Sequence, residues 1–312
     1  MLRVAILDDF QQAWERTDGV RRMRERVEIT ILTEPFGDAA ALRGYDALIA
    51  NRERTRFDRA LLEALEDIRV IVQTGKHNPH IDFAAAEDCG IAVVTAAGGY
   101  SIGAAELAIG LTFAVTRQIP MLDAAVRRGE WLPPSTPVLH GKTFGVVGFG
   151  RVGRHAARIV QSCGMQVVAW SRHLNAETAA QAGVEYRELD DLLREADVVS
   201  IHASLNDESR GLIDARRLAL MKPTACLINT ARGPIVDEAA LIAALGEGRI
   251  AGAGLDVFDT EPLPSDHPLL RCPNVVLTPH IGFPTDHGYE QFSTAACAAL
   301  FEFLDSQAGQ PD

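Results

Sequence analysis

The sequence predicts an α/β protein of two domains, each built around a mostly parallel sheet. The chain has 312 residues, whereas a single domain commonly has about 100 to 200 residues. Short apolar runs of strand length alternate with segments of helical periodicity, which is the pattern of strand–helix–strand units. A proline-rich stretch at residues 133–137 separates two series of such units. Two α/β sheets in succession therefore account for the length.

The first series occupies about the first hundred residues. Helices are expected at residues 57–65, where leucines recur at helical spacing, and at residues 84–89, which run into Gly90. Strands are expected at residues 3–7, 28–32, 47–50, 70–73 and 92–94.

A long helix is expected at residues 101–118, capped by Ser101 and ended before Pro120. Near the C-terminus, apolar side chains from Tyr289 to Leu300 recur at helical spacing and predict a helix that packs back on the first domain. The strands of the second series are expected at residues 143–147, 166–170, 198–202, 225–229, 252–257 and 275–278.

Composition excludes several classes of protein. Apolar residues make up 47% of the chain and charged residues 23%, which suits a folded soluble core. A net charge of −12 disfavours nucleic acid and anionic lipid as partners. No apolar run reaches the roughly 18 residues of a membrane span, and the acidic N-terminus does not resemble a signal peptide. The five cysteines are widely spaced, so we expect no metal site and a cytoplasmic location.

A dinucleotide-binding motif follows the strand at residues 143–147. Gly148, Gly150 and Gly153 stand in G-x-G-x-x-G spacing, with helix-like residues 154–163 behind them. In this context the first glycine permits the tight turn, the second lets the backbone approach a pyrophosphate, and the third allows close helix–strand packing. The alternative is a merely tight strand-to-helix turn.

The end of the next strand bears on the choice of cofactor. Enzymes that use NAD usually place an acidic residue there to bind the ribose hydroxyls, whereas this chain has Ser171 and Arg172. Arg172 supplies a cation that can pair with a 2′-phosphate. NADP is therefore favoured, and NAD with an exposed Arg172 is the alternative.

Three later segments end expected strands and carry charged residues. They are residues 229–237, 254–262 and 278–282, and they present an arginine, acidic residues and a histidine. Parallel sheets bind ligands at the carboxyl ends of their strands. These side chains can bind a carboxylate and move a proton, as hydride transfer to a carbonyl requires.

From about residue 47 to residue 282, the ordered motifs resemble the D-isomer-specific 2-hydroxyacid dehydrogenases, a family that includes phosphoglycerate and glyoxylate/hydroxypyruvate enzymes. Further matching segments are residues 105–107, 164–165 and 197–202. The resemblance implies a Rossmann-like doubly wound nucleotide domain, residues 101–283. It is inserted into a smaller flavodoxin-like substrate domain, residues 1–100 and 284–312.

The resemblance also implies roles for individual residues. His280 is the acid/base, Glu261 its orienting carboxylate, and Arg232 the anchor of a small 2-oxo or 2-hydroxy acid. Glu261 would favour the charged imidazole, and Arg232 would bind the carboxylate with two parallel hydrogen bonds. His202 is expected to be structural. Contacts with the cofactor are expected from Arg151, Val152, Thr230, Ala231 and Asp256.

The roles of two loops remain open, and the first of them departs from the family pattern. Residues 74–79 keep Gly75, but Lys76 and His77 replace the small residues that hold a substrate carboxylate through backbone N–H groups. These side chains either contact substrate or turn to solvent. In residues 51–55, Arg52 or Arg54 either reaches a distal anionic group of the substrate or forms a surface ion pair.

Two expectations concern the whole chain. The resemblance implies a homodimer formed through the nucleotide domain, and we expect the interface within residues 101–137, whose helix is almost wholly apolar. The alternative function is a dinucleotide-sensing scaffold like the C-terminal-binding corepressors, which have the same fold. The chain lacks the long disordered tails of those scaffolds, so we expect an enzyme.

Overall fold

The computed structural model describes residues 1–75, 78, 80–96, 102–131, 133–272 and 274–308. The chain divides into two compact units. The terminal unit comprises Met1–Tyr100 and Pro284–Asp312, and the central unit comprises Ser101–Phe283. The predicted Ser101 cap lies outside the described residues.

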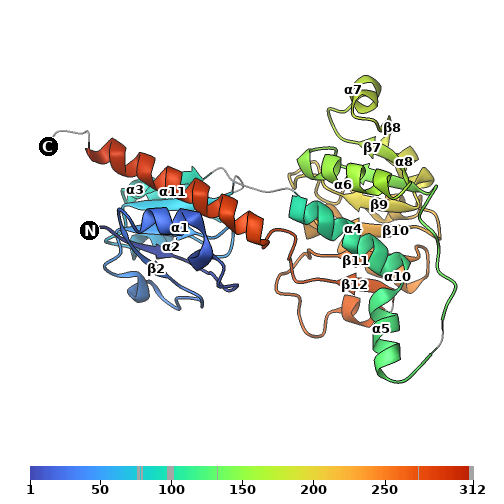
Figure 1. The fold of residues 1–312 in the computed structure, drawn as a ribbon, viewed down its shortest axis with the longest axis horizontal. Helices are drawn as coiled ribbons and strands as arrows, with labels where there is room; N and C mark the ends of the chain where they lie inside the picture. The colour runs from blue at the N-terminus through green and yellow to red at the C-terminus, as the bar shows by residue number, and fades with distance from the viewer. Residues whose placement is uncertain (76–77, 79, 97–101, 132, 273, 309–312) are drawn as a thin grey trace. The chain divides into compact units, whose positions relative to one another are not determined.

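The terminal unit contains a five-stranded parallel sheet in the order β2-β1-β3-β4-β5 (Figure 1). This strand order defines a flavodoxin-like fold, as predicted. The carboxyl ends of β1, β3 and β4 are neighbours, because these strands pair in register with one another. The strands are β1 (Arg3–Ile6), β2 (Glu28–Ile31), β3 (Ala47–Ala50), β4 (Val70–Thr74) and β5 (Ala92–Ala96).

Helices cover this sheet, and short polar side chains fix where several begin. Thr17, Asp58 and Asp82 each accept a hydrogen bond from a backbone N–H in the first turn of the helix that follows. Of the expected helix at residues 57–65, only Arg59–Glu63 is helical, since Phe57 joins a β-bridge to Ile81. The helices are α1 (Asp18–Met23), α2 (Arg59–Glu63), α3 (Phe83–Asp88) and α11 (Asp286–Ala308), with 3-10 turns η1 (Trp14–Arg16) and η2 (Ala39–Leu42).

Helix α11 returns to the terminal unit and packs beside α1 (Figure 1). The approach is so close that a Cβ on Gly19 would lie 2.2 Å from the carbonyl carbon of Ser293. Only glycine therefore permits this contact. Tyr289 and Phe292 are buried on α11, as the helical spacing predicts.

The central unit contains a seven-stranded parallel sheet in the order β12-β11-β10-β9-β6-β7-β8. The order reverses at β6, which is the switch point of a Rossmann-like sheet. The sequence prediction omitted β8, whose two residues are too few for a recognisable pattern. The strands are β6 (Thr143–Val147), β7 (Gln166–Trp170), β8 (Glu185–Tyr186), β9 (Val198–Ile201), β10 (Cys226–Asn229), β11 (Gly252–Leu255) and β12 (Val275–Leu277).

Helices on both faces of this sheet bury two apolar clusters. One cluster includes residues of α4 and α6, and the other includes residues of α8 and α10. The expected long helix ends at Thr116, and a separate helix, α5, begins at Ile119 with Pro120 in its first turn. The helices are α4 (Ile102–Thr116), α5 (Ile119–Arg127), α6 (Arg151–Ser162), α7 (Ala176–Gln181), α8 (Leu189–Glu195), α9 (Ala215–Leu218) and α10 (Glu238–Gly246), with 3-10 turns η3 (Gly233–Ile235) and η4 (Pro268–Arg271).

Two negative findings apply to the residues that the structure describes. No single helix there is both long and apolar enough to cross a membrane; α4 and α5 meet that condition only together, as a pair bent by 59°. No group of three or more His, Cys, Asp or Glu side chains there is arranged to hold a metal ion.

Candidate active site

The glycine motif forms the turn between β6 and α6. Gly148 has φ +101°, and a Cβ on it would lie 2.3 Å from the backbone nitrogen of Ala203. A Cβ on Gly153 would lie 2.4 Å from the carbonyl oxygen of Gly148. Both glycines are therefore required by the backbone itself.

Gly150 differs from the other two glycines because it faces open space. Among the described atoms, none beyond its chain neighbours lies within 4 Å of a Cβ placed there, and Gly150 is the N-cap of α6. The helix begins at Arg151, earlier than the expected residue 154, so Arg151 and Val152 form its first turn. Open backbone at a helix N-terminus fits the pyrophosphate of a dinucleotide.

The side chains at the end of β7 are already engaged. Ser171 is half-buried and Arg172 is exposed. Arg172 forms an ion pair of 2.6 Å with Glu208 and donates a hydrogen bond of 3.3 Å to the side chain of Asn206. Glu208 and Asn206 both lie in the loop after β9. An acidic residue, Glu208, therefore does lie near the end of β7, although it follows Arg172 by 36 residues in the sequence.

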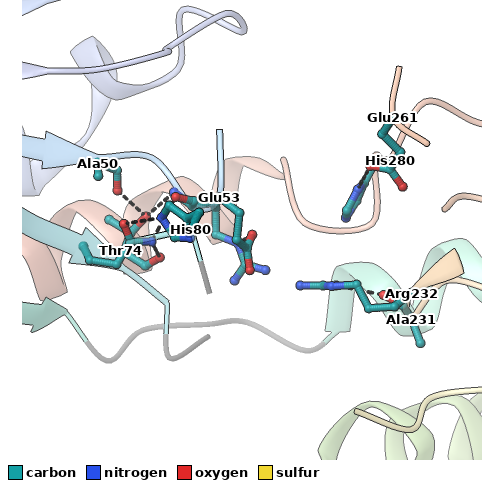
Figure 2. A network of polar contacts seen from close by, with 10 residues as sticks. Ala50, Glu53, Thr74, His80, Ala231, Arg232, Glu261 and His280 are labelled. Atoms are coloured by element: carbon teal, nitrogen blue, oxygen red, sulfur yellow. Dashed lines mark hydrogen bonds and ion pairs between the residues drawn. The ribbon is translucent and has the colours of Figure 1, made fainter. Parts of the chain in front are cut away.

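The loop after β10 is fixed by Asn229. Its side chain accepts a hydrogen bond from the backbone of Ala231 and donates one to the carbonyl oxygen of Arg232, both at 3.0 Å. Thr230 donates to the carbonyl oxygen of Ala104 on α4 at 3.4 Å. These contacts hold the base of the Arg232 side chain while its guanidinium extends from the loop (Figure 2).

The loop after β11 lies against the loop after β10. A Cβ on Gly233 would lie 2.1 Å from the carbonyl carbon of Phe258, so glycine is needed for this contact. The packing places Arg232 close enough to Glu261 for its charge to help lower the pKa of that carboxyl group.

Asp256 holds the turn that carries His280. Its carboxylate is fully buried and accepts hydrogen bonds from Thr278 Oγ1 at 2.5 Å, Ile281 N at 2.8 Å and Gly282 N at 2.9 Å. Burial raises the pKa of Asp256, while these hydrogen bonds and the charge of His280 oppose the rise. The observed bonds support the turn, and the expected contact with the nicotinamide remains a prediction.

His280 and Glu261 form the central pair of the site. His280 Nδ1 lies 2.6 Å from Glu261 Oε2, and Glu261 Oε1 accepts the backbone N–H of Phe258 at 2.9 Å (Figure 2). Burial tends to raise the pKa of Glu261, but its hydrogen bond to His280 and the nearby charges lower it overall. With Nδ1 engaged by Glu261, the other ring nitrogen, Nε2, is the one left to meet a substrate. The His280 ring and the Arg232 guanidinium extend to the same side of the central unit (Figure 2).

His202 directly follows β9. Its Nε2 lies 2.9 Å from Ser200 Oγ, and its Nδ1 is buried. Burial lowers the pKa of His202 to about 4, so the ring is neutral at physiological pH. The contact with Ser200 suits the structural role that we expect for it.

In the terminal unit, Arg52 and Gly75 lie together. The Arg52 guanidinium would be 2.9 Å from a Cβ on Gly75, which has φ +92°. The Gly75 N–H donates to the carbonyl oxygen of Ala96 at 3.1 Å, so in this structure it is not directed at a ligand. Arg54 donates to the carbonyl oxygen of Asp8 at 2.5 Å. Lys76 and His77 lie outside the described residues.

Sequence reasoning missed several residues that support the site. Asn229, Thr278 and Glu208 were not singled out, although the first two lie in segments that were. Buried polar residues at strand ends are a usable signal, because such groups need hydrogen-bond partners. Glu208 gave no such signal, since it is exposed and its partner Arg172 lies in the turn after β7.

Comparisons with known proteins agree with this architecture. Residues 109–282 match the model of the D-isomer specific 2-hydroxyacid dehydrogenase NAD binding domain. The glyoxylate reductase of Thermococcus litoralis is 37% identical over 304 residues, which cover 93% of this chain and 91% of that protein. The solved structure of a putative D-3-phosphoglycerate dehydrogenase from Ralstonia solanacearum has a TM-score of 0.90 and 34% identity, covering 98% of this chain and 95% of that one.

Some relatives are longer than this chain. The D-3-phosphoglycerate dehydrogenase of Methanocaldococcus jannaschii is 33% identical over 314 aligned residues, which cover 99% of this chain but 59% of that protein. The fold and these matches define a dehydrogenase with a Rossmann-like nucleotide domain. The chain belongs to the D-isomer-specific 2-hydroxyacid dehydrogenase family, and its cofactor is a nicotinamide dinucleotide. The matches do not favour the scaffold alternative.

Proposed function

We propose that the protein is an oxidoreductase that transfers a hydride between a nicotinamide dinucleotide and C2 of a D-2-hydroxy acid or its 2-oxo acid partner. The observation that carries this proposal is the 2.6 Å contact between His280 and Glu261, at the strand ends of an NAD-binding domain and with Arg232 nearby. An acid/base pair beside a carboxylate anchor is the constellation that this reaction needs.

His280 is the proposed acid/base. In oxidation, the neutral ring of His280 would take the hydroxyl proton at Nε2, and a bound nicotinamide would supply the hydride acceptor. In reduction, the imidazolium returns that proton to the oxygen that develops negative charge. Glu261 keeps the proton on Nδ1 in the neutral ring and stabilises the imidazolium.

Arg232 is the proposed anchor of the substrate carboxylate. Its guanidinium offers a planar pair of N–H donors that match the two oxygens of a carboxylate. The fixed loop after β10 limits how far this fork can move, so the bound acid would present C2 in one orientation.

NADPH is the proposed preferred cofactor. Ser171 lacks the carboxylate that binds the ribose hydroxyls of NAD, and Arg172 can pair with a 2′-phosphate. The ion pair of Arg172 with Glu208 opposes this preference, because a phosphate must compete with a carboxylate already in place. We therefore expect a modest preference, with NADH also accepted.

The experiment that tests the activity is a panel of 2-oxo acids assayed by oxidation of NADH and NADPH. Glyoxylate, pyruvate, hydroxypyruvate and 3-phosphohydroxypyruvate differ in size and charge at C3. Turnover of at least one member, with the D-hydroxy acid as product, supports the proposal. No turnover with any member and either cofactor overturns it.

We further infer a homodimer and a cytoplasmic location. Helix α5 buries none of its residues, and Ile119, Met121 and Val126 on it are about half exposed. An apolar exposed helix suits an interface with a second copy of the chain. All five cysteines are free thiols, two of them exposed, as suits a reducing compartment.

A further inference from the structure

The peptide bond between Phe258 and Asp259 connects two parts of the candidate active site. Its carbonyl carbon would lie 2.1 Å from a Cβ on Gly233, so it packs directly against the loop after β10. The N–H of Phe258 donates to Glu261 Oε1 at 2.9 Å. The position of this peptide therefore affects both the loop after β10 and the carboxylate of Glu261.

A second carboxylate holds the same peptide from its other end. The N–H of Asp259 donates to Glu238 Oε2 at 3.3 Å. Glu238 is the first residue of α10 and has no part in the proposed proton transfer. Two consecutive backbone N–H groups are thus accepted by two different carboxylates, and Glu238 fixes the start of the turn that ends at Glu261.

The carboxylate of Glu238 is oriented by His267. Glu238 Oε1 lies 3.1 Å from His267 Nε2, and the two side chains are only 19% and 15% exposed. His267 Nδ1 accepts the backbone N–H of Leu269 at 3.4 Å, so the neutral ring carries its proton on Nε2 and donates it to Glu238. Since His267 occupies one oxygen of Glu238, the other oxygen is directed at Asp259.

The charges around Glu238 indicate that its value lies in these contacts. Burial raises the pKa of Asp259, and the negative charges of Glu238 and Asp237 add to the rise, while Arg210 and His267 oppose it. A carboxylate on Glu238 is thus unfavourable for the neighbouring acidic side chain. Its favourable contribution comes from the two hydrogen bonds that its oxygens accept.

We propose that Glu238, oriented by His267, is a positioning residue that acts through Glu261. Glu238 holds the main chain before Glu261, and Glu261 in turn keeps the ring of His280 in one orientation (Figure 2). This inference rests on the proposed function, in which His280 is the acid/base. Glu238 itself is assigned no contact with substrate or cofactor.

The first measurement is the kinetics of reduction of the 2-oxo acid that the wild type reduces best. Glu238→Leu removes both acceptor oxygens and should lower kcat by roughly tenfold or more, because a displaced acid/base pair loses its alignment. The Kd for NADPH should stay within about twofold, since the glycine turn is untouched. The alkaline fall of kcat/KM should move to lower pH, because a displaced Glu261 stabilises the imidazolium less.

A double variant tests whether Glu238 acts through Glu261. In a Glu261→Gln background, Glu238→Leu should change kcat by less than about twofold, because the carboxylate that it positions is gone. Equal effects of Glu238→Leu in both backgrounds would make the two residues independent and would overturn the inference.

Three further variants separate positioning from charge and from stability. Glu238→Gln removes the charge but keeps an oxygen that can accept from Asp259, so it should retain roughly a third or more of the wild-type kcat. Glu247→Gln removes an exposed carboxylate at the opposite end of α10 and should resemble the wild type. His267→Leu leaves α10 unchanged and should move the alkaline fall in the same direction, which provides the test should Glu238→Leu fail to fold.

The second measurement needs no turnover. In protein labelled with ¹⁵N at histidine, at a pH high enough for neutral rings, the nitrogen chemical shifts report which ring nitrogen carries the proton. The His280 signals are those that disappear in His280→Gln. The wild type should hold this proton on Nδ1, which faces Glu261, and Glu238→Leu should give a mixture of both tautomers.

An unmoved tautomer or an unmoved alkaline fall in Glu238→Leu would give Glu238 a merely structural role and overturn the inference. So would a wild type in which His280 is already a mixture of tautomers. If the wild type reduces no 2-oxo acid with either cofactor while the tautomer changes as expected, the proposed function fails although Glu238 still positions Glu261.

Discussion

His280 has the left-handed backbone conformation, with φ +54°. The buried carboxylate of Asp256 holds the residues on both sides of it, through Thr278 and through the N–H groups of Ile281 and Gly282. Strain at a reactive residue is tolerated when neighbouring bonds fix its geometry. The direction of the imidazole is therefore set by Asp256 and Glu261 together.

The first prediction concerns His280. His280→Gln removes the proton donor and acceptor and should lower kcat by roughly two to four orders of magnitude. The Kd for NADPH should remain within threefold, because the glycine turn and the end of β7 are untouched. Steady-state kinetics and a fluorescence titration measure the two effects. A variant that retains more than a third of the wild-type kcat would exclude His280 from the reaction.

The second prediction concerns pH. The hydrogen bond to His280 lowers the pKa of Glu261, which keeps a negative charge beside the ring. Reduction of a 2-oxo acid needs the imidazolium, so its rate falls as pH rises and that proton is lost. Glu261→Gln removes the stabilising charge and should move this fall to lower pH. An unmoved alkaline limb in the kcat/KM profile would limit Glu261 to a structural role.

The third prediction uses His202, whose folded-state pKa of about 4 lies below its ordinary 6.5 because of burial. Between these values the unfolded chain binds more protons, so the free energy of unfolding decreases as pH falls through that window. The contribution is roughly 3 kcal/mol in full. His202→Gln should flatten this part of the pH dependence in urea unfolding. Parallel curves for both proteins between pH 6.5 and 4 would contradict it.

At the scale of single residues, the sequence was sufficient to identify residues that belong to recognisable motifs. It did not identify residues whose importance depends on tertiary contacts. Arg232, Glu261 and His280 follow separate strands, and their spacing within motifs was sufficient to single them out. The structure brings these three together in the central unit. Their roles remain predictions. Glu208 was missed because its contact is with Arg172, more than 30 positions earlier in the chain.

At the scale of elements, the end of β7 and the loop after β9 act as one unit. Arg172 and Glu208 form an ion pair in which both side chains are partly exposed, at 48% and 70%, so its strength is modest. A bound 2′-phosphate would compete with Glu208 for the guanidinium. The end of β7 supplies Arg172 and the loop after β9 supplies Glu208. How strongly the two pair therefore determines how readily Arg172 can bind the cofactor.

The fourth prediction concerns this competition. Glu208→Gln should lower the KM for NADPH several-fold and leave the KM for NADH nearly unchanged, because only the phosphate gains from the freed arginine. Ser171→Asp with Arg172→Ala should reverse the preference toward NADH. Glu130→Gln, which removes another exposed carboxylate paired with an arginine, is the matched control. If the KM for NADH falls in parallel, Glu208 does not discriminate between the cofactors.

Strands were easier to predict than short helices. The apolar runs located the predicted strands of both sheets with small errors at their ends, because many of the strands, such as β3, β4 and β6, are buried along their whole length. Helices such as α1, α7 and α9 have six residues or fewer, which is too short to establish a helical period. Their starts are instead marked by capping side chains, for example Asn175 before α7.

At the scale of the whole molecule, the exposed face of α5 leads to the fifth prediction. Met121→Asp with Val126→Asp should convert a dimer into monomers at micromolar concentration, because buried charges oppose association. Sedimentation velocity measures the change. Leu270→Asp, at another half-exposed apolar position, should leave the dimer intact. A wild type that sediments as a monomer would remove the basis for this prediction.

The insertion of the central unit between the two parts of the terminal unit has a consequence for synthesis on the ribosome. The central unit is continuous along the chain and can complete its core as soon as residue 283 has emerged. The terminal unit cannot complete its core at that stage, because its sheet and α1 pack against α11. Helix α11 is separated in sequence from α1, β4 and β5 by the whole central unit. Contacts of such long sequence separation form slowly. During translation, the apolar surface around Trp14 and Val20 therefore remains accessible to chaperones until the last helix arrives.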